Sequence, residues 1–171
     1  YASGNTDLTD GTPDDNFCFL EQTVVNSMDP NDKTCLEGNA IAPNQVGKYV
    51  HYKIRFENTG TANAQNIVVK DEIDATKFDI STLIPMDGSH DFTTRIKGNK
   101  VEFIFENIQL PFDDANNDGY VLFKIKTKPS LVVGDSFSNS ASIYFDYNHP
   151  IVTDPAVTTI QLLGEKDFEF T

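Results

Sequence analysis

The residue types best suited to chemistry lie together in one acidic segment, residues 113–120 with the sequence DDANNDGY. From Asp114 onward the segment follows the pattern D-x-N-x-D-G, the first half of a calcium-binding loop. Calcium prefers several oxygen ligands at about 2.3–2.6 Å, and alternate side chains of such a loop can converge on one ion while its glycine allows the sharp turn. The candidate ligands are Asp113, Asp114, Asn116, Asp118 and the backbone carbonyl of Tyr120.

The second half of the calcium pattern is missing. Its twelfth position is Ile125, where an EF-hand has a bidentate glutamate, so an EF-hand is excluded. Calcium would therefore need further ligands from elsewhere in the fold. The alternative is an ordinary acidic turn between two strands, in which Asp and Asn side chains bond to nearby backbone. Both interpretations stay open, and the net charge of −13 slightly favours calcium.

Two kinds of covalent cross-link have the residue types they need. Cys18 and Cys35 are 17 positions apart, which excludes a CxxC redox or zinc motif. In a secreted protein we expect them to form one disulfide, worth about 3 kcal/mol for a loop of this length; the alternative is two free thiols. An internal isopeptide bond would use Asn139 with one of two lysines and a glutamate, namely Lys53 or Lys70 and Glu57. All three groups would have to be buried, and Lys53 lies on the polar face of its strand, which disfavours this bond.

The sequence contains no recognisable catalytic motif. Its three histidines are scattered, and Ser89-His90-Asp91 has the residue types of a triad without a nucleophile-elbow sequence. The acidic residues at 29–32 are interpreted as a turn. Those at 71–74 (Asp71, Glu72 and Asp74) are interpreted as a solvated face. We therefore expect no enzyme.

Length and charge exclude several classes of partner. The chain has 171 residues, with 13 Lys and Arg against 26 Asp and Glu. This excess of negative charge repels nucleic acid and anionic membrane surfaces, and it favours a monomer in solution. No apolar run approaches the about 20 residues that a membrane-spanning helix needs.

Apolar and polar residues alternate along almost the whole chain, as is typical of half-buried strands. The pattern is clearest in residues 50–57, 101–106, 121–126 and 137–145, and in the last of these it places Asn139 on the apolar face. No segment has a helical period over three turns, and Gly98-Asn99 has the sequence of a tight hairpin turn. We predict an all-β, immunoglobulin-like sandwich of two sheets with about seven to nine strands.

Several separated segments, taken in order, resemble a β-sandwich domain of Bacteroidota surface proteins. They are DPNDKTCLEGN (29–39), YKIRFENTGTANAQNIVVKDEID (52–74), GSHDF (88–92), FIFENIQLPFDDANNDGYVLFKIK (103–126) and FSNSASIYFDYNHPIVTD (137–154). In that family the domain stands near the C-terminus of large secreted proteins, just before a type IX secretion sorting domain, and it brings no catalytic residue. The resemblance implies that residues 1–28 end a preceding segment with one strand, 29–163 form the sandwich, and 164–171 lead toward a removed sorting domain.

These observations predict a non-enzymatic structural or presentation module of a secreted or outer-membrane surface protein. It would act as a spacer adjoining the type IX secretion signal and be stabilised by calcium if the acidic loop binds the ion. Its partners would be neighbouring domains of the same polypeptide and the secretion machinery. The alternative is an adhesin-like module that binds a glycan or a protein, with Tyr144, Tyr147 and the loop 113–120 as candidate contacts.

Overall fold

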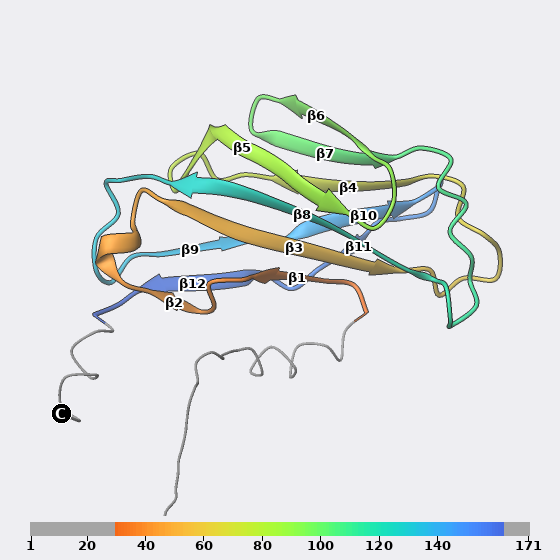
Figure 1. Ribbon diagram of the computed structural model, residues 1–171, viewed down its shortest axis with the longest axis horizontal. Helices are drawn as coiled ribbons and strands as arrows, with labels where there is room; N and C mark the ends of the chain where they lie inside the picture. The colour runs from red at the N-terminus through yellow and green to blue at the C-terminus, as the bar shows by residue number, and fades with distance from the viewer. Residues whose placement is uncertain (1–29, 163–171) are drawn as a thin grey trace, which may run out of the picture. The chain divides into compact units, whose positions relative to one another are not determined.

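The computed structural model describes residues 30–162, which from Asn31 onward belong to one compact unit. Within these residues the chain forms twelve strands and a single 3-10 turn (Figure 1). The strands are β1 (Asp32–Cys35), β2 (Ala40–Ile41), β3 (Tyr49–Glu57), β4 (Ile67–Glu72), β5 (Phe78–Gly88), β6 (Thr93–Lys97), β7 (Lys100–Phe105), β8 (Asp118–Thr127), β9 (Ser136–Asn139), β10 (Ala141–Phe145), β11 (Ile151–Val152) and β12 (Ala156–Ile160), with η4 (Pro43–Gln45) between β2 and β3.

The strands form three sheets. One has the order β1-β3-β8-β5, a second has the order β11-β10-β4-β7-β6, and a short third sheet has the order β2-β12-β9. All pairings are antiparallel except β12 with β2. The predicted all-β sandwich is therefore confirmed. The strands outnumber the expected seven to nine partly because β2 and β11 have only two residues each and carry too little sequence to show a period.

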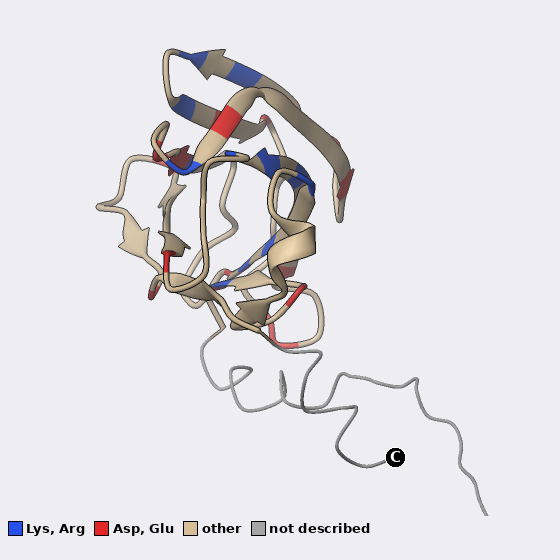
Figure 2. Ribbon diagram, turned by 90° about the vertical axis from the view of Figure 1, so that its left-hand side faces the viewer, with Lys and Arg blue, Asp and Glu red and all other residues tan. Residues whose placement is uncertain are grey.

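Alternating burial explains why the long strands form where the sequence predicts them. In β3 and β8 every second side chain is buried, and the two strands pair antiparallel from Tyr49 opposite Lys126 to Glu57 opposite Asp118. Figure 2 shows lysine and arginine positions mainly on strands, and in β3 and β8 they alternate with the buried residues. The hairpin predicted at residues 98–99 joins β6 to β7, and Gly98 has a φ of 64°, a conformation that favours glycine.

Aromatic rings fill the space between the sheets. Tyr52 and Phe103 both stack on Phe123, with ring centroids 5.7 and 5.3 Å apart, and Phe56 meets Phe105 edge to face at 5.2 Å. Such pairs contribute about 0.5–1.5 kcal/mol each beyond the area they bury. The phenylalanines of the alternating segments thus lie in the core.

The ends of the predicted domain lie beyond the described residues. The boundaries at 29 and 163, and the assignments of residues 1–28 and 164–171, stay predictions. Between residues 30 and 162, no helix has the length and apolar character needed to cross a membrane.

Candidate functional site

One lysine, one aspartate and one asparagine meet in the core, and each comes from a different sheet. Lys33 lies in β1, Asp71 in β4 and Asn139 in β9. Asp71 points inward because it follows the buried residues Ile67 and Val69 at two-residue intervals along β4. Asn139 points inward for the same reason. It lies two residues after the buried Phe137 of β9 and two residues before the buried Ala141 of β10.

The three side chains meet at a single oxygen atom. Lys33 Nζ donates a hydrogen bond to Asp71 Oδ2 in an ion pair whose side chains are both 0% exposed. Asn139 Nδ2 donates to the same Oδ2 at 3.4 Å. The other carboxylate oxygen, Asp71 Oδ1, is buried and has no hydrogen-bond partner in the described part of the chain. One carboxylate oxygen therefore contacts both an amine nitrogen and a carboxamide nitrogen.

Aromatic rings surround the amine. Lys33 Nζ lies 4.7 Å from the ring centroid of Tyr52 and 5.3 Å from that of Phe123. Both rings belong to residues that are 0% exposed, so the site lies in a low-dielectric interior. Such rings attract an ammonium group, but they do not supply the hydrogen-bond acceptors that would replace its lost hydration.

Burial shifts both charged groups toward their neutral forms. Loss of hydration lowers the pKa of Lys33, and the nearby Asp71 charge offsets that effect only in part. Loss of hydration likewise raises the pKa of Asp71, against the opposing influence of Lys33. A neutral lysine amine is a nucleophile, and a neutral carboxylic acid can give and take protons. The cluster therefore places an amine and a carboxamide in contact with one carboxyl group that can transfer protons.

This cluster corrects the interpretation of Asp71 as part of a solvated face. The residue is 0% exposed, and it is in phase with the apolar residues Ile67, Val69 and Ile73. The charge-based interpretation failed because it treated residues 71–74 as one group, whereas the two-residue period of a strand separates their directions. The period itself was the signal that could have found this residue.

The lysines and the glutamate with the residue types for an isopeptide bond have other partners. Lys53 points outward over the ring of Tyr120, with Nζ 4.6 Å from its centroid, and Lys70 Nζ lies 3.6 Å from Glu102 Oε2 on another outward face. The acid beside Asn139 is an aspartate of β4, and Glu57 instead accepts a hydrogen bond from an asparagine near the start of β8. The sequence does not clearly indicate that Lys33 is buried, because β1 is short and begins in a polar segment. Its only sequence signal is the two-residue spacing from buried Cys35.

The predicted calcium ligands occupy a loop and the start of β8. Asp113 Oδ2 accepts a hydrogen bond from Asn116 Nδ2 at 2.8 Å, and the Tyr120 carbonyl accepts the backbone N–H of Ser89 at 2.9 Å. Gly119 lies inside β8 rather than in a sharp turn. Across residues 30–162, no group of three or more His, Cys, Asp or Glu side chains is arranged to hold a metal ion. Calcium binding by Asp114 and its neighbours stays a prediction.

The predicted disulfide has only one of its two cysteines within the described residues. Cys35 is buried in β1, with Sγ 3.6 Å from Glu37 Oε1. Burial raises the pKa of the Cys35 thiol to about 11. Cys18 lies outside the described residues, so the disulfide stays a prediction.

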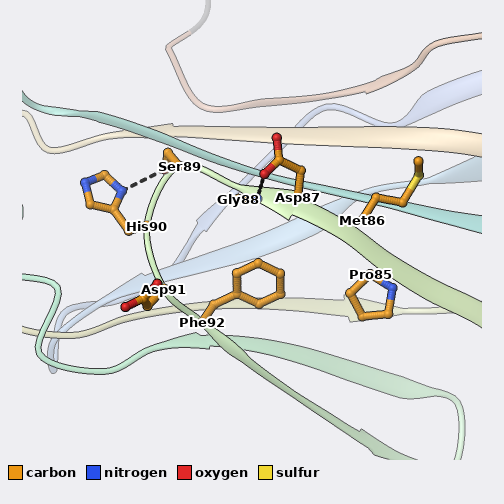
Figure 3. A pocket seen from close by; sticks show the side chains of 8 residues that line it. All are labelled: Pro85, Met86, Asp87, Gly88, Ser89, His90, Asp91 and Phe92. Carbon is orange, nitrogen blue, oxygen red and sulfur yellow. Dashed lines mark hydrogen bonds between the residues drawn. The ribbon is translucent and has the colours of Figure 1, made fainter.

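A shallow pocket of about 380 Å³ is lined by residues 85–92 and contains the sequence Ser89-His90-Asp91 (Figure 3). Ser89 Oγ and His90 Nδ1 are 2.7 Å apart, while the Asp91 side chain lies apart from this pair. Ser89 Oγ also accepts the backbone N–H of Tyr120 at 2.8 Å. These residues do not form a triad, because the carboxylate does not orient the imidazole.

Comparison with known proteins identifies a family and a fold. The family model described as "Domain of unknown function (DUF7619)" matches residues 29–159. No curated protein matches the chain.

Three similar solved structures come from surface proteins. The N-terminal domain of the Streptococcus gordonii adhesin Sgo0707 has 16% identity and a TM-score of 0.55, with 77% of this chain and 32% of that chain covered. The D312A form of BcpA, the major pilin subunit of Bacillus cereus, has 17% identity and a TM-score of 0.55, with coverages of 76% and 40%. SpaA, a major pilin of Corynebacterium diphtheriae whose modular pilus assembly has stabilising isopeptide bonds, has 11% identity and a TM-score of 0.51, with coverages of 77% and 38%. At these identities the similarity shows the sandwich fold alone, and this chain matches less than half of each of those proteins.

Proposed function

This chain belongs to the family described as a domain of unknown function (DUF7619), and we propose that it is a non-enzymatic structural module of a cell-surface protein. One observation carries the proposal: the cluster of Lys33, Asp71 and Asn139 is enclosed in the core and connects β1, β4 and β9. Its carboxylate and amine have no exposed side-chain surface, so no substrate can reach them from solution. Contacts between three sheets instead resist their separation.

The similar folds support a location at the cell surface. Adhesin and pilin domains share this sandwich, and the structure of SpaA points to a modular pilus assembly with stabilising isopeptide bonds. The resemblance to Bacteroidota surface domains supports a more specific role as a spacer that adjoins a type IX secretion signal. In this role the partners are neighbouring domains of the same polypeptide and the secretion machinery.

Mechanical resistance tests the structural role. The 171-residue chain would be placed between two unrelated handle domains of known unfolding force and pulled from its ends by single-molecule force spectroscopy. A load-bearing module stays folded when the handles unfold. The matched control is Phe56→Ala, which removes a fully buried ring and should lower the force. Unfolding of the parent chain well below the force of the handles would contradict the structural role.

A second candidate function is binding of an anionic glycan, and the outer face of β3 and β8 favours it. Lys124 and Lys126 lie over the ring of Tyr49, with Nζ 4.5 and 5.2 Å from its centroid, and Lys53 lies over Tyr120 at 4.6 Å. The antiparallel register of the two strands places these ammonium groups on one face. The outward positions of β3 and β8 hold four basic residues, Lys53, Arg55, Lys124 and Lys126, and two acidic ones, Glu57 and Asp118, in a chain whose net charge is −13. Carboxylate or sulfate groups of a glycan would be attracted to this face.

Binding to immobilised heparin, a sulfated glycan, tests this second candidate. The expected result is retention of the parent chain at low salt, lost in the variant K53E/K124E/K126E. The matched control, K97E/K100E, changes lysines on the β6–β7 hairpin and should stay bound. No retention of the parent, or equal loss in both variants, would exclude specific binding at this face.

A further inference from the structure

We propose that Lys33 and Asn139 become joined by an intramolecular isopeptide bond, with Asp71 transferring the proton between the two nitrogen atoms. The bond is independent of the proposed function, because it could form in a sandwich with any role. Its geometric basis is the single oxygen, Asp71 Oδ2, that contacts both Lys33 Nζ and Asn139 Nδ2. The attacking and the leaving nitrogen of the reaction therefore share one proton carrier.

The surroundings suit this reaction better than they suit a permanent ion pair. Lys33 and Asp71 have side chains with no exposed surface, and Asn139 is 5% exposed. Exclusion of water favours the neutral amine over the ammonium ion and protects the carboxamide from hydrolysis. The aromatic rings of Tyr52 and Phe123 confine the lysine side chain, which holds its amine in place for attack.

The reaction balances without an oxidant or a second substrate. Proton transfer within the ion pair gives neutral Lys33 and neutral Asp71. The Lys33 Nζ lone pair attacks Asn139 Cγ and forms the new C–N bond. The protonated Asp71 gives its proton to Asn139 Nδ2 and, as a carboxylate again, takes one from the attacking nitrogen. The bond between Cγ and Nδ2 then breaks, one ammonia leaves, and Asp71 ends as a neutral carboxylic acid that keeps one proton received from the Lys33 amino group.

The product resolves an electrostatic cost in the core. The bond replaces a buried amine and a primary carboxamide with one neutral secondary amide. Before the reaction, Asp71 Oδ1 is buried and has no hydrogen-bond partner in the described part of the chain. After it, the protonated Asp71 can donate a hydrogen bond to the new amide carbonyl.

The choice of residues is specific. Among residues 30–162, Lys33 is the only buried lysine, so no other lysine amine of that segment is enclosed with an asparagine. The three other buried asparagines of the segment have different partners: Asn58 and Asn117 donate to backbone carbonyls or to Glu57, and Asn31 accepts the backbone N–H of Glu57. Asn139 contacts the same carboxylate that binds the buried lysine.

Intact-mass spectrometry of the purified, folded chain tests the proposal. The expected mass is lower than the sequence mass by one ammonia, about 17 Da. Proteolytic peptide mapping should recover one branched peptide that links the segment around residue 33 to the segment around residue 139. A folded parent chain with the full sequence mass would overturn the proposal. Loss of ammonia that maps to any other asparagine would overturn it as well.

Variants assign the three roles. Lys33→Met and Asn139→Ala should have their full sequence masses, and Asp71→Asn should have its full mass because it has no carboxyl group to transfer protons. The matched control, Lys53→Met, should still lose one ammonia, since its side chain points outward. An Asp71→Asn chain that forms the bond at the parent rate would overturn the role of Asp71. If a variant fails to fold, the mass of the parent chain and its peptide map decide the question alone.

Discussion

Replacing Asn139 with alanine should destabilise the fold far more than the loss of one hydrogen bond can explain. The residue contributes a single contact to Asp71 at 3.4 Å, worth about 1 kcal/mol at most. A covalent link to Lys33, by contrast, closes a loop of 106 positions in the sequence. The chain-entropy model assigns about 4.7 kcal/mol to a cross-link of about this loop length. We therefore expect Asn139→Ala to lower the free energy of unfolding by about 5 kcal/mol.

A double-mutant cycle separates the covalent link from ordinary contacts. Lys33→Met should cost about as much as Asn139→Ala, because either change prevents the bond. The double variant should then lose little more than each single variant, since the same link cannot be lost twice. The expected coupling energy is about 4–5 kcal/mol, well above the range of about 0.5–3 kcal/mol for non-covalent neighbours.

Equilibrium unfolding in guanidinium chloride, followed by circular dichroism, measures the four free energies of the cycle. Thermal unfolding should show the same loss as a decrease of about 10–20 °C in Tm for a chain of this size. Additive costs in the double variant would refute the reasoning. So would an Asn139→Ala cost of about 1 kcal/mol, because that is the value for a hydrogen bond alone.

Three further predictions concern other sites. The calcium-loop hypothesis predicts that calcium at a hundredfold excess over its Kd stabilises the parent by about 2.7 kcal/mol relative to chelator, and that Asp114→Asn abolishes the shift in Tm; equal Tm values with calcium and chelator would remove the hypothesis. Glu102→Gln should destabilise by under about 1 kcal/mol at pH 7, because hydrogen bonding from the largely exposed Arg95 lowers the pKa of Glu102. A lowered pKa gives stability that is present above the unfolded value of 4.5 and is lost as the pH falls through the folded value, so denaturant titrations of parent and variant should converge in acid; a constant difference would contradict this. Gly119→Ala should cost about 1–3 kcal/mol, because its Cβ would lie 2.3 Å from Phe56 Cε2, and an unchanged Tm would contradict this contact.

The sequence predicted the fold because the signal for a strand is local. Alternation at two-residue intervals in β3, β7, β8 and β10 needs only neighbouring residues to be visible, and the structure buries the predicted faces. The same signal placed Asn139 correctly on the inward side. The hairpin turn at residues 98–99 is also local, since glycine with positive φ is a property of one residue.

The site could not be predicted in the same way, because its members are brought together by the fold. Lys33 and Asp71 are 38 positions apart, and Asp71 and Asn139 are 68 positions apart. A charged residue in a strand is usually exposed, so charge alone gave the wrong direction for Asp71. Predicting which lysine lies near Asn139 required knowing which lysine is buried in the core. β1, with four residues, was too short to show that this lysine is Lys33.

The mass of the intact, folded protein tests the central claim most directly, because a covalently tied core and an ion-paired core have different masses. The account predicts a mass about 17 Da below that of the 19.0 kDa sequence. The Asn139→Ala variant should have the full mass of its own sequence. A parent chain with its full sequence mass would contradict it and leave Lys33 and Asp71 as a buried ion pair.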